Sequence, residues 1–264
     1  MLEEWMRNRN RHPMYGERLN DDSYRSIWDD GAQSYTGVWY SEISKKIVDR
    51  LKSKHMLDGS ILDIACGPGI YTLLFGRICS SVYALDFSEP MLDRLRMVCR
   101  EEGLSNVTAV QCDCRIIPPD IHCDTAFCSL CPTMNDPELI IGMERYGDRC
   151  AYVSSKGGGS LETEVWKELG CDYSYSGYDP EYPFAYLKER GRAPSLDYFT
   201  QTVEQTTETE SVERSLLHTI SIYREIGDKE KKAVRDVVLS HSSDNFVKQR
   251  RKVRMGLICW DSEV

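Results

Sequence analysis

Short apolar runs alternate with stretches of helical spacing through the middle of the chain. The runs have the length and composition of strands that are buried on both faces, and they lie at residues 60–65, 81–85, 107–111, 125–130 and 150–154. Between them, apolar residues recur at helical spacing, with Ser88 as a suitable N-cap and Pro90 in the first turn of a helix. Strands that alternate with helices in this way predict a parallel sheet with helices on both faces.

The flanking segments differ from this central pattern. Residues 1–22 are polar without a clear period, which predicts a loosely ordered arm, whereas the spacing over 23–53 predicts a helical lid broken near Gly37. Residues 160–194 are rich in tyrosine, proline and glycine and predict an insertion. Beyond the insertion we expect a strand over 195–206, helices over about 209–225 and 228–240, and a last strand over 253–260.

These elements predict one α/β domain with a doubly wound, mostly parallel sheet of seven strands. Its parts are an N-terminal arm and lid over 1–55, a core over 56–159, the aromatic-rich insertion after strand five over 160–194, and C-terminal strands and helices over 195–264 that complete the sheet. A chain of 264 residues can bury one substantial core, which agrees with a single domain.

The net charge and the first residues indicate in which compartment the protein works and which partners it is expected to bind. No apolar run approaches the roughly 20 residues that span a bilayer, and MLEEWMRNRNRH lacks the apolar stretch of a signal peptide. We therefore expect a cytoplasmic protein without a membrane partner. The net charge of -9 disfavours nucleic acid, because phosphate contacts supply most non-specific affinity for it. The basic run Lys248–Arg254 is interpreted as a solvated turn before the last strand, although it keeps a protein or RNA substrate open.

Eleven cysteines are many for this length, and their odd number makes a disulfide framework unexpected. Several stand in strand-like runs, where a free cysteine acts as a small buried residue: Cys112, Cys114, Cys123, Cys128, Cys150 and Cys259. Cys128-x-x-Cys131 has the spacing of a metal or redox pair. A structural zinc site needs four ligands, and no second pair completes one. We therefore expect Cys128 in the core, Cys131 in a pocket, and no metal.

The strongest chemical signal is a strand that runs into a glycine turn, Ile61-Leu-Asp-Ile-Ala-Cys-Gly-Pro-Gly-Ile70. Glycines let the backbone approach a ligand closely, and the N-terminus of the following helix favours a negative group. Asp86 stands about 20 residues further on, at the tip of the next strand. A carboxylate at that place can accept hydrogen bonds from both hydroxyls of a ribose.

Two ligand classes use this layout, the dinucleotides and S-adenosylmethionine. The dinucleotide fingerprint has a third glycine where this chain has Thr72, and a pyrophosphate would be repelled by Asp63 inside the strand. The amino group and the sulfonium of S-adenosylmethionine are cations that a carboxylate attracts, so we favour this methyl donor over NAD. The structural alternatives are that Gly67 and Gly69 only form a turn and that Asp86 only caps a helix.

Residues 60–135 resemble the class I, Rossmann-like methyltransferases that use S-adenosylmethionine. ILDIACGPGIYT is similar to the first motif of that family, ALDFSEPML to the second and QCDC to the third. The first motif departs from the family at Ala65, where a glycine usually stands. The resemblance implies that the turn glycines lie against the methionine part of the cofactor, that Asp86 holds its ribose, and that Asp113 accepts from the adenine amine. The expected cofactor residues are Tyr35, Asp63, Ala65, Cys66, Gly67, Gly69, Asp86, Phe87, Met91, Asp113, Cys114 and Ser129.

The methyl acceptor is not evident from the sequence. The tip of the fourth strand lacks the N-P-P-Y sequence of enzymes that methylate nucleobase amines, and the histidines have no spacing that indicates a general base. We expect an enclosed pocket between the lid and the insertion, whose clustered aromatic residues either contact the substrate or only pack the insertion onto the sheet. The residues expected to line this pocket are Trp39, Tyr40, Cys131, Pro132, Thr133 and Tyr178.

These observations favour methyl transfer to a small molecule by in-line displacement, in which the protein supplies mainly proximity and alignment. Two alternatives stay open. One is a methyltransferase that acts on a protein or RNA, and the other is a non-catalytic module that binds S-adenosylmethionine.

Overall fold

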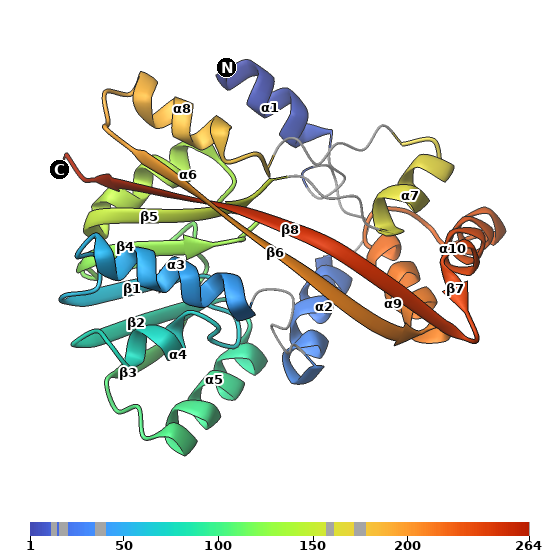
Figure 1. The fold of residues 1–264 in the computed structure, drawn as a ribbon, viewed down its shortest axis with the longest axis horizontal. Coiled ribbons are helices and arrows are strands. Elements are labelled where there is room, and N and C mark those ends of the chain that lie inside the picture. Colours follow the sequence, from blue (N-terminus) through green and yellow to red (C-terminus); the bar gives the residue numbers. More distant parts are fainter. Residues whose placement is uncertain (12–14, 16–20, 35–40, 157–160, 172–177, 264) are drawn as a thin grey trace. The chain divides into compact units, whose positions relative to one another are not determined.

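The structure, a computed structural model, describes residues 1–11, 15, 21–34, 41–156, 161–171 and 178–263 (Figure 1). It divides into two compact units. The first unit comprises residues 1–27, 156–179 and 201–253, and the second comprises residues 28–155, 180–200 and 254–264. Helix α2 (Asp21–Ser34) and strands β6 (Ser195–Glu208) and β8 (Phe246–Asp261) contribute residues to both units.

The sheet contains the strands that the apolar runs predict. Its other strands are β1 (Ser60–Ile64), β2 (Ser81–Asp86), β3 (Val107–Gln111), β4 (Cys123–Ser129), β5 (Gly147–Ser155) and the two-residue β7 (Ser242–Ser243). In the described part of the chain the order is β3-β2-β1-β4-β5-β8-β6, with β7 paired to β8 outside this path. Strands β1 to β5 are parallel, and β8 is antiparallel to β5. The predicted seven-stranded, mostly parallel sheet is confirmed, and its strand order reverses between β1 and β4.

The helices that lie wholly in the second unit are α3 (Ser41–Ser53), α4 (Thr72–Gly76), α5 (Glu89–Glu102), α6 (Pro137–Gly142) and α8 (Glu181–Glu189). Helices α5 and α6 begin at a side chain that caps the helix, Ser88 and Asp136. The predicted N-cap Ser88 accepts a hydrogen bond from the Met91 N–H, and α5 ends at the left-handed Gly103. Helix α5 packs on β2 and β3, α3 contacts α4, and α6 contacts α8 (Figure 1).

The first unit has a helical core of its own. It contains α1 (Leu2–Asn10), α7 (Leu161–Glu168), α9 (Thr209–Ser221) and α10 (Asp228–Ser240). Val165, Trp166, Ile220 and Val238 are among the residues buried between α7, α9 and α10. The prediction of a loosely ordered arm is wrong for residues 2–10, which form α1. The acidic first turn and the basic last turn of α1 complement the helix dipole. This helix was not predicted because its sequence has no apolar period.

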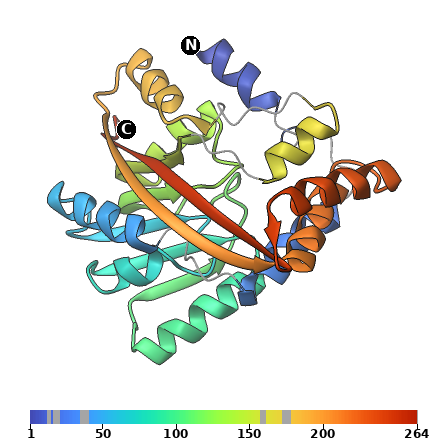
Figure 2. The same cartoon turned by 45° about the vertical axis from the view of Figure 1, so that its right-hand side comes forward.

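Strand β8 begins earlier than predicted, at Phe246. The basic run Lys248–Arg254 therefore lies inside the strand, and its interpretation as a turn is wrong. Exposed basic side chains at 248, 250, 252 and 254 alternate with partly buried residues, which is the two-residue period of a strand. The period was missed because neither face of this run is strongly apolar. Figure 2 shows β6 and β8 side by side, as their pairing requires.

The segment predicted as an insertion contains α7 and α8, and its residues 172–177 lie outside the described part of the chain. Tyr182, Phe184 and Tyr186 belong to α8, and Tyr186 is buried. For Tyr186 the packing alternative is therefore the one that the structure supports. Among the described residues, no helix has the length and apolar character needed to cross a membrane.

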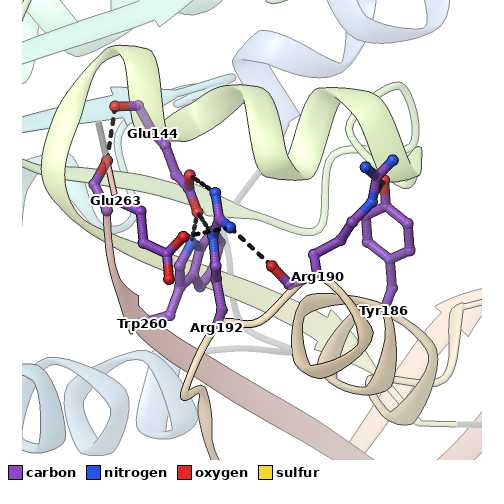
Figure 3. Close-up of polar contacts among 7 residues, drawn as sticks. Glu144, Tyr186, Arg190, Arg192, Trp260 and Glu263 are labelled. Atoms are coloured by element: carbon purple, nitrogen blue, oxygen red, sulfur yellow. Dashed lines mark hydrogen bonds and ion pairs between the residues drawn. The ribbon is translucent and has the colours of Figure 1, made fainter.

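A buried ion pair joins three distant parts of the second unit near the amino end of β5 (Figure 3). The Glu144 side chain is 3% exposed and accepts from Arg192, Nε at 2.9 Å and Nη2 at 2.6 Å. Trp260 Nε1 donates to the same carboxylate at 2.9 Å, and Arg192 Nη1 donates to Glu263 at 2.7 Å. Three donors thus compensate the burial of one charge and fasten the segment after α8 and the end of β8 to the start of β5.

We expect Arg192→Gln to lower the free energy of unfolding by about 3–5 kcal/mol, because Glu144 would stay buried without its charged partner. The matched control is Arg190→Gln, since the Arg190–Glu138 pair has side chains that are 52% and 76% exposed. Loss of such an exposed pair costs about 0–1 kcal/mol. Urea denaturation followed by circular dichroism measures both, and equal losses would contradict the role given to Glu144.

Candidate active site

The turn after β1 is built from left-handed backbone. Ala65, Gly67 and Gly69 have φ angles of 56°, 56° and 94°. The Cys66 N–H donates to the Leu85 carbonyl at 2.9 Å, and the Gly69 N–H donates to the Cys66 carbonyl at 3.1 Å. The turn is therefore fastened to β2 before α4 begins.

The two glycines of this turn have different surroundings. A Cβ on Gly69 would lie 2.4 Å from Leu95 Cδ1, so the absence of a side chain lets α5 pack against the turn. A Cβ on Gly67 would meet no atom of the described residues within 4 Å. Gly69 thus has a packing role that the motif did not reveal, whereas the backbone of Gly67 is open to close approach by a ligand.

Asp63 lies buried beneath the turn, with 2% of its surface exposed. Its Oδ2 accepts a hydrogen bond of 2.6 Å from Thr72 Oγ1, the residue that stands in place of the third glycine of a dinucleotide site. Burial raises the pKa of Asp63 to about 7, the Thr72 hydrogen bond lowers it in part, and the nearby Asp86 raises it further. A cation beside such a carboxyl would return it to the charged form.

Asp86 is held by backbone N–H groups on both oxygens. The Gly67 N–H donates to Oδ2 at 2.8 Å, and the Ser88 N–H donates to Oδ1 at 2.9 Å. Burial raises the pKa of Asp86, and these N–H groups oppose that rise. A carboxylate has about four acceptor positions, so the bonds fix its plane and leave room for hydroxyl donors of a ligand.

The second half of α2 reaches the same strand end. Ser88 Oγ donates to Asp29 Oδ1 at 2.5 Å, and Arg94 Nη1 donates to the Ala32 carbonyl at 2.9 Å. The predicted helix over this stretch is confirmed. The contact of Asp29 was not predicted, because it depends on how α2 packs against α5 and leaves no periodic signal in the sequence.

Asp113 forms a bidentate ion pair with a residue of its own loop. Arg115 donates to Asp113 from Nε at 2.9 Å and from Nη2 at 2.5 Å. The Arg115 backbone N–H donates to the same carboxylate at 2.9 Å. A ligand amine at this place would have to share Asp113 with Arg115.

The end of β4 contains strained backbone that the sequence did not reveal. Leu130 has a φ of 52°, a conformation that bulky residues rarely adopt. Such strain costs on the order of 1–3 kcal/mol and tends to occur at functional sites. Because Ile64 pairs with Cys128, the left-handed Ala65 and Leu130 lie close to the carboxyl ends of neighbouring strands.

Three cysteines meet beyond this point. Cys131 is partly exposed, and the neighbouring thiols of Cys114 and Cys128 lower its pKa. Cys128 is fully buried, which confirms its predicted place in the core, and Cys123, Cys150 and Cys259 are buried as predicted. The prediction of burial is wrong for Cys112 and Cys114, which lie beyond the end of β3 and are partly exposed.

Most predicted cofactor residues lie at the carboxyl ends of β1 to β4 in the second unit, or in the turns and helices that follow them. These residues are Asp63, Ala65, Cys66, Gly67, Gly69, Asp86, Phe87, Met91, Asp113, Cys114 and Ser129. Tyr35, Trp39 and Tyr40 lie outside the described residues. Tyr178 belongs to the first unit, where its ring centroid is 6.2 Å from that of Tyr15. The pocket between lid and insertion stays a prediction.

Residues 61–147, which run from β1 to the start of β5, match the family described as a methyltransferase domain. The chain contains a methyltransferase domain. The predicted methyltransferase is thereby confirmed for these residues. The domain includes the glycine turn, Asp86, Asp113 and the cysteines at the end of β4.

Solved structures of other proteins resemble a larger part of this chain than the methyltransferase domain alone. Magnesium protoporphyrin IX methyltransferase from Synechocystis PCC 6803, solved with bound SAH, is 16% identical and superposes with a TM-score of 0.54 over 91% of this chain and 93% of that one. DhpI, solved as a complex with SAH, is 16% identical with a TM-score of 0.50 over 92% and 97% of the chains. At this identity the likeness is one of fold.

A shorter sequence match adds no function. Over 51 residues the chain is 43% identical to an uncharacterized protein of Haemophilus influenzae, and this match spans 19% of each chain.

We expect Ala65→Gly to raise the free energy of unfolding by about 0.5–1 kcal/mol. Left-handed backbone costs alanine about 1–2 kcal/mol, which exceeds the roughly 0.5–1 kcal/mol by which the freedom of glycine destabilises the folded state. Ala126→Gly, in β4 of the same methyltransferase domain, is the control and should lower stability. A lower urea midpoint for Ala65→Gly would contradict the strain assigned to this turn.

Proposed function

We propose that the chain transfers the methyl group of S-adenosylmethionine to a small-molecule acceptor. The observation that carries this proposal is the pair of buried carboxyls, Asp63 in the strand that leads to the glycine turn and Asp86 on the N–H of Gly67, whose backbone is open. Two buried carboxyls would repel a pyrophosphate, and burial raises the pKa of Asp63 to about 7, so that a cation beside it would favour its charged form. The ammonium and sulfonium groups of S-adenosylmethionine supply such cations, and its ribose supplies hydroxyl donors.

Each residue at this edge has a distinct task in the proposal. Asp86, with its plane fixed by the Gly67 and Ser88 N–H groups, accepts from the ribose hydroxyls. Asp63 faces the positive charge of the methionine part. Asp113 accepts from the adenine amine while it keeps its ion pair with Arg115.

The bound methyl donor supplies an activated methyl group that an acceptor nucleophile takes in line, so the task of the protein is alignment. Asp86 and Gly67 fix the position of the donor in this proposal. Burial of Asp63 keeps a negative charge close to the cationic centre without a competing water shell.

The small-molecule class of acceptor rests on two observations. The net charge of -9 disfavours a nucleic-acid substrate, and one similar fold belongs to an enzyme that is named for methylation of magnesium protoporphyrin IX. The alternative of a protein or RNA acceptor is favoured by the exposed basic side chains along β8, at 248, 250, 252 and 254. A module that binds S-adenosylmethionine without catalysis is the second alternative.

The proposal is tested with S-adenosylmethionine that carries a labelled methyl group. We expect label to enter the small-molecule fraction of a cell extract and not its protein or RNA fractions. Asp86→Ala is the variant for comparison, because it removes the acceptor of the ribose hydroxyls. Each charged hydrogen bond is worth about 1.5–3 kcal/mol, so calorimetry should show at least tenfold weaker binding of S-adenosylhomocysteine.

Circular dichroism of Asp86→Ala establishes that the variant is folded. Label in the protein or RNA fraction would replace the small-molecule acceptor, and binding without transfer to any fraction would favour the non-catalytic module. Unchanged affinity in folded Asp86→Ala would overturn the ribose assignment.

Binding of S-adenosylhomocysteine is also expected to release a proton below neutral pH. The pKa of Asp63 is raised to about 7 in the free protein, so this carboxyl is largely protonated at pH 6. The ammonium group of the ligand favours the ionised form, so affinity should rise with pH up to about 7 and then level off. Calorimetry at pH 6 in two buffers of different ionisation enthalpy measures the proton.

Asp63→Asn is the matched control for this proton, because it keeps the shape of the side chain and a hydrogen-bond partner for Thr72. In this variant the proton release should disappear and the affinity should lose its dependence on pH. The same release in wild type and Asp63→Asn would assign the proton to another group.

A further inference from the structure

The Asp63 carboxyl lies in a largely apolar layer between the sheet and α4. Asp63 is paired with Phe127 of β4, and paired residues of neighbouring parallel strands point to the same face of the sheet. The Phe127 ring centroid lies 4.8 Å from that of Tyr71, the N-cap of α4, and 5.0 Å from that of Phe75 in the same helix. A negative charge in such a layer is costly unless a donor compensates it.

Thr72, the first residue of α4, supplies this donor. Its Oγ1 donates to Asp63 Oδ2 at 2.6 Å, a length typical of a hydrogen bond from a hydroxyl to a carboxylate. Thr72 is fully buried and Asp63 is 2% exposed, so water competes little for this bond. A β-branched side chain is stiff, and burial keeps its hydroxyl in place. In the described part of the chain, no other side chain donates to the Asp63 carboxyl.

The same hydrogen bond joins the two ends of the glycine turn. Asp63 belongs to β1, which leads into the turn, and Thr72 stands nine residues later, where the turn has passed into α4. The left-handed residues Ala65, Gly67 and Gly69 lie between them. The bond therefore holds the carboxyl at the base of the turn. A dinucleotide site has a glycine at the place of Thr72 and so has no hydroxyl for this task.

We propose that Thr72 is a positioning residue of the cofactor site, whose hydroxyl holds the Asp63 carboxyl in one orientation and favours its charged form for a cationic ligand. This inference rests on the proposed function, in which Asp63 faces the positive charge of S-adenosylmethionine. Thr72 acts through Asp63 and has no contact of its own with the ligand in this proposal.

The hydrogen bond makes the charge of Asp63 depend on Thr72 near neutral pH. Burial raises the pKa of Asp63 to about 7, and the Thr72 bond lowers it in part. The titratable groups around Asp63 are Asp86 at the end of β2, Cys66 in the turn, Cys128 in β4 and Tyr71 at α4. Burial raises the pKa of both thiols, so they stay neutral in this range. Without the Thr72 hydroxyl, the pKa of Asp63 should rise above about 7, and more of this carboxyl should be neutral at pH 7.

Thr72→Val tests this role, because it removes the hydroxyl and keeps the shape of the side chain. Calorimetry measures the binding of S-adenosylhomocysteine to this variant and to wild type between pH 6 and pH 8.5. The affinity of Thr72→Val should be about threefold to tenfold lower than that of wild type at pH 7 and within about twofold of it at pH 8.5, where Asp63 is ionised in both. The ratio of the two dissociation constants at each pH cancels the titration of the ligand. Thr72→Ser restores the hydroxyl and should keep the wild-type profile.

Thr125→Val is the matched control for the loss of a buried hydroxyl. Thr125 is also fully buried in the methyltransferase domain, but its hydroxyl donates to the Met56 carbonyl at 2.7 Å and not to a carboxyl. This variant should bind S-adenosylhomocysteine like wild type at every pH. Circular dichroism and the urea midpoint establish that each variant is folded.

A second measurement needs no ligand. Nuclear magnetic resonance of protein with 13C-labelled aspartate carboxyls follows the titration of Asp63, and Asp63→Asn identifies its signal. The midpoint of this titration should lie at higher pH in Thr72→Val than in wild type, and it should stay in place in Thr72→Ser and Thr125→Val. A purely structural role of Thr72 would leave the midpoint unchanged.

Two outcomes would overturn the role of Thr72. One is a carboxyl titration and a binding profile that are the same in Thr72→Val and wild type, and the other is an equal loss in Thr72→Ser and Thr72→Val. A wild-type protein that binds no S-adenosylhomocysteine at any pH would contradict the proposed function instead. In that case the position assigned to the ligand falls with it, whereas the carboxyl titration still decides whether Thr72 controls the charge of Asp63.

Discussion

The hydrogen bond from the Gly67 N–H to Asp86 is the contact on which the candidate site depends. It ties the turn after β1, in which Ala65, Gly67 and Gly69 have left-handed backbone, to the end of β2. Through its other oxygen, Asp86 also receives the Ser88 N–H at the start of α5, and the hydroxyl of Ser88 holds Asp29 of α2. One carboxylate therefore sets the positions of a turn and two helix segments.

Several acidic groups lie at the same edge of the sheet. Asp63 and Asp86 are buried, and each is disfavoured as an anion by its burial, while the charge of Cys131 raises the pKa of Asp86 further. Burial therefore favours the neutral form of both carboxyls more than water would. A cationic ligand relieves this conflict, and because it binds only the folded state, it should also stabilise the fold. The more strongly burial disfavours the charged form of these carboxyls, the more a positively charged ligand gains over a neutral one.

Local signals in the sequence were enough for most of the sheet. The runs at 60–65 and 107–111 are short and apolar, and Ser88 followed by Pro90 marks the start of α5, so these elements were predicted within a residue. The basic part of β8 was missed because its residues alternate between exposed and partly buried positions without alternating between polar and apolar side chains. The class I family could be identified because its motifs are contiguous in the chain.

Contacts between distant segments were beyond the reach of the sequence. Asp29 meets Ser88 across 59 positions, and Arg192 meets Glu144 across 48. The left-handed Leu130 has no signal either, since leucine normally argues against that conformation. Such contacts form only once the strands have paired, and no local pattern in the sequence predicts them.

The buried Glu144 network lies at the amino end of β5, whereas the glycine turn, Asp86 and the cysteines lie at the carboxyl ends of the strands. The second unit thus keeps rigidity and chemistry at opposite ends of the same strands. A substitution at the carboxyl ends of the strands leaves the contacts of Glu144 with Arg192 and Trp260 in place. The end of the domain that carries the glycine turn can therefore vary without loss of this buried ion pair.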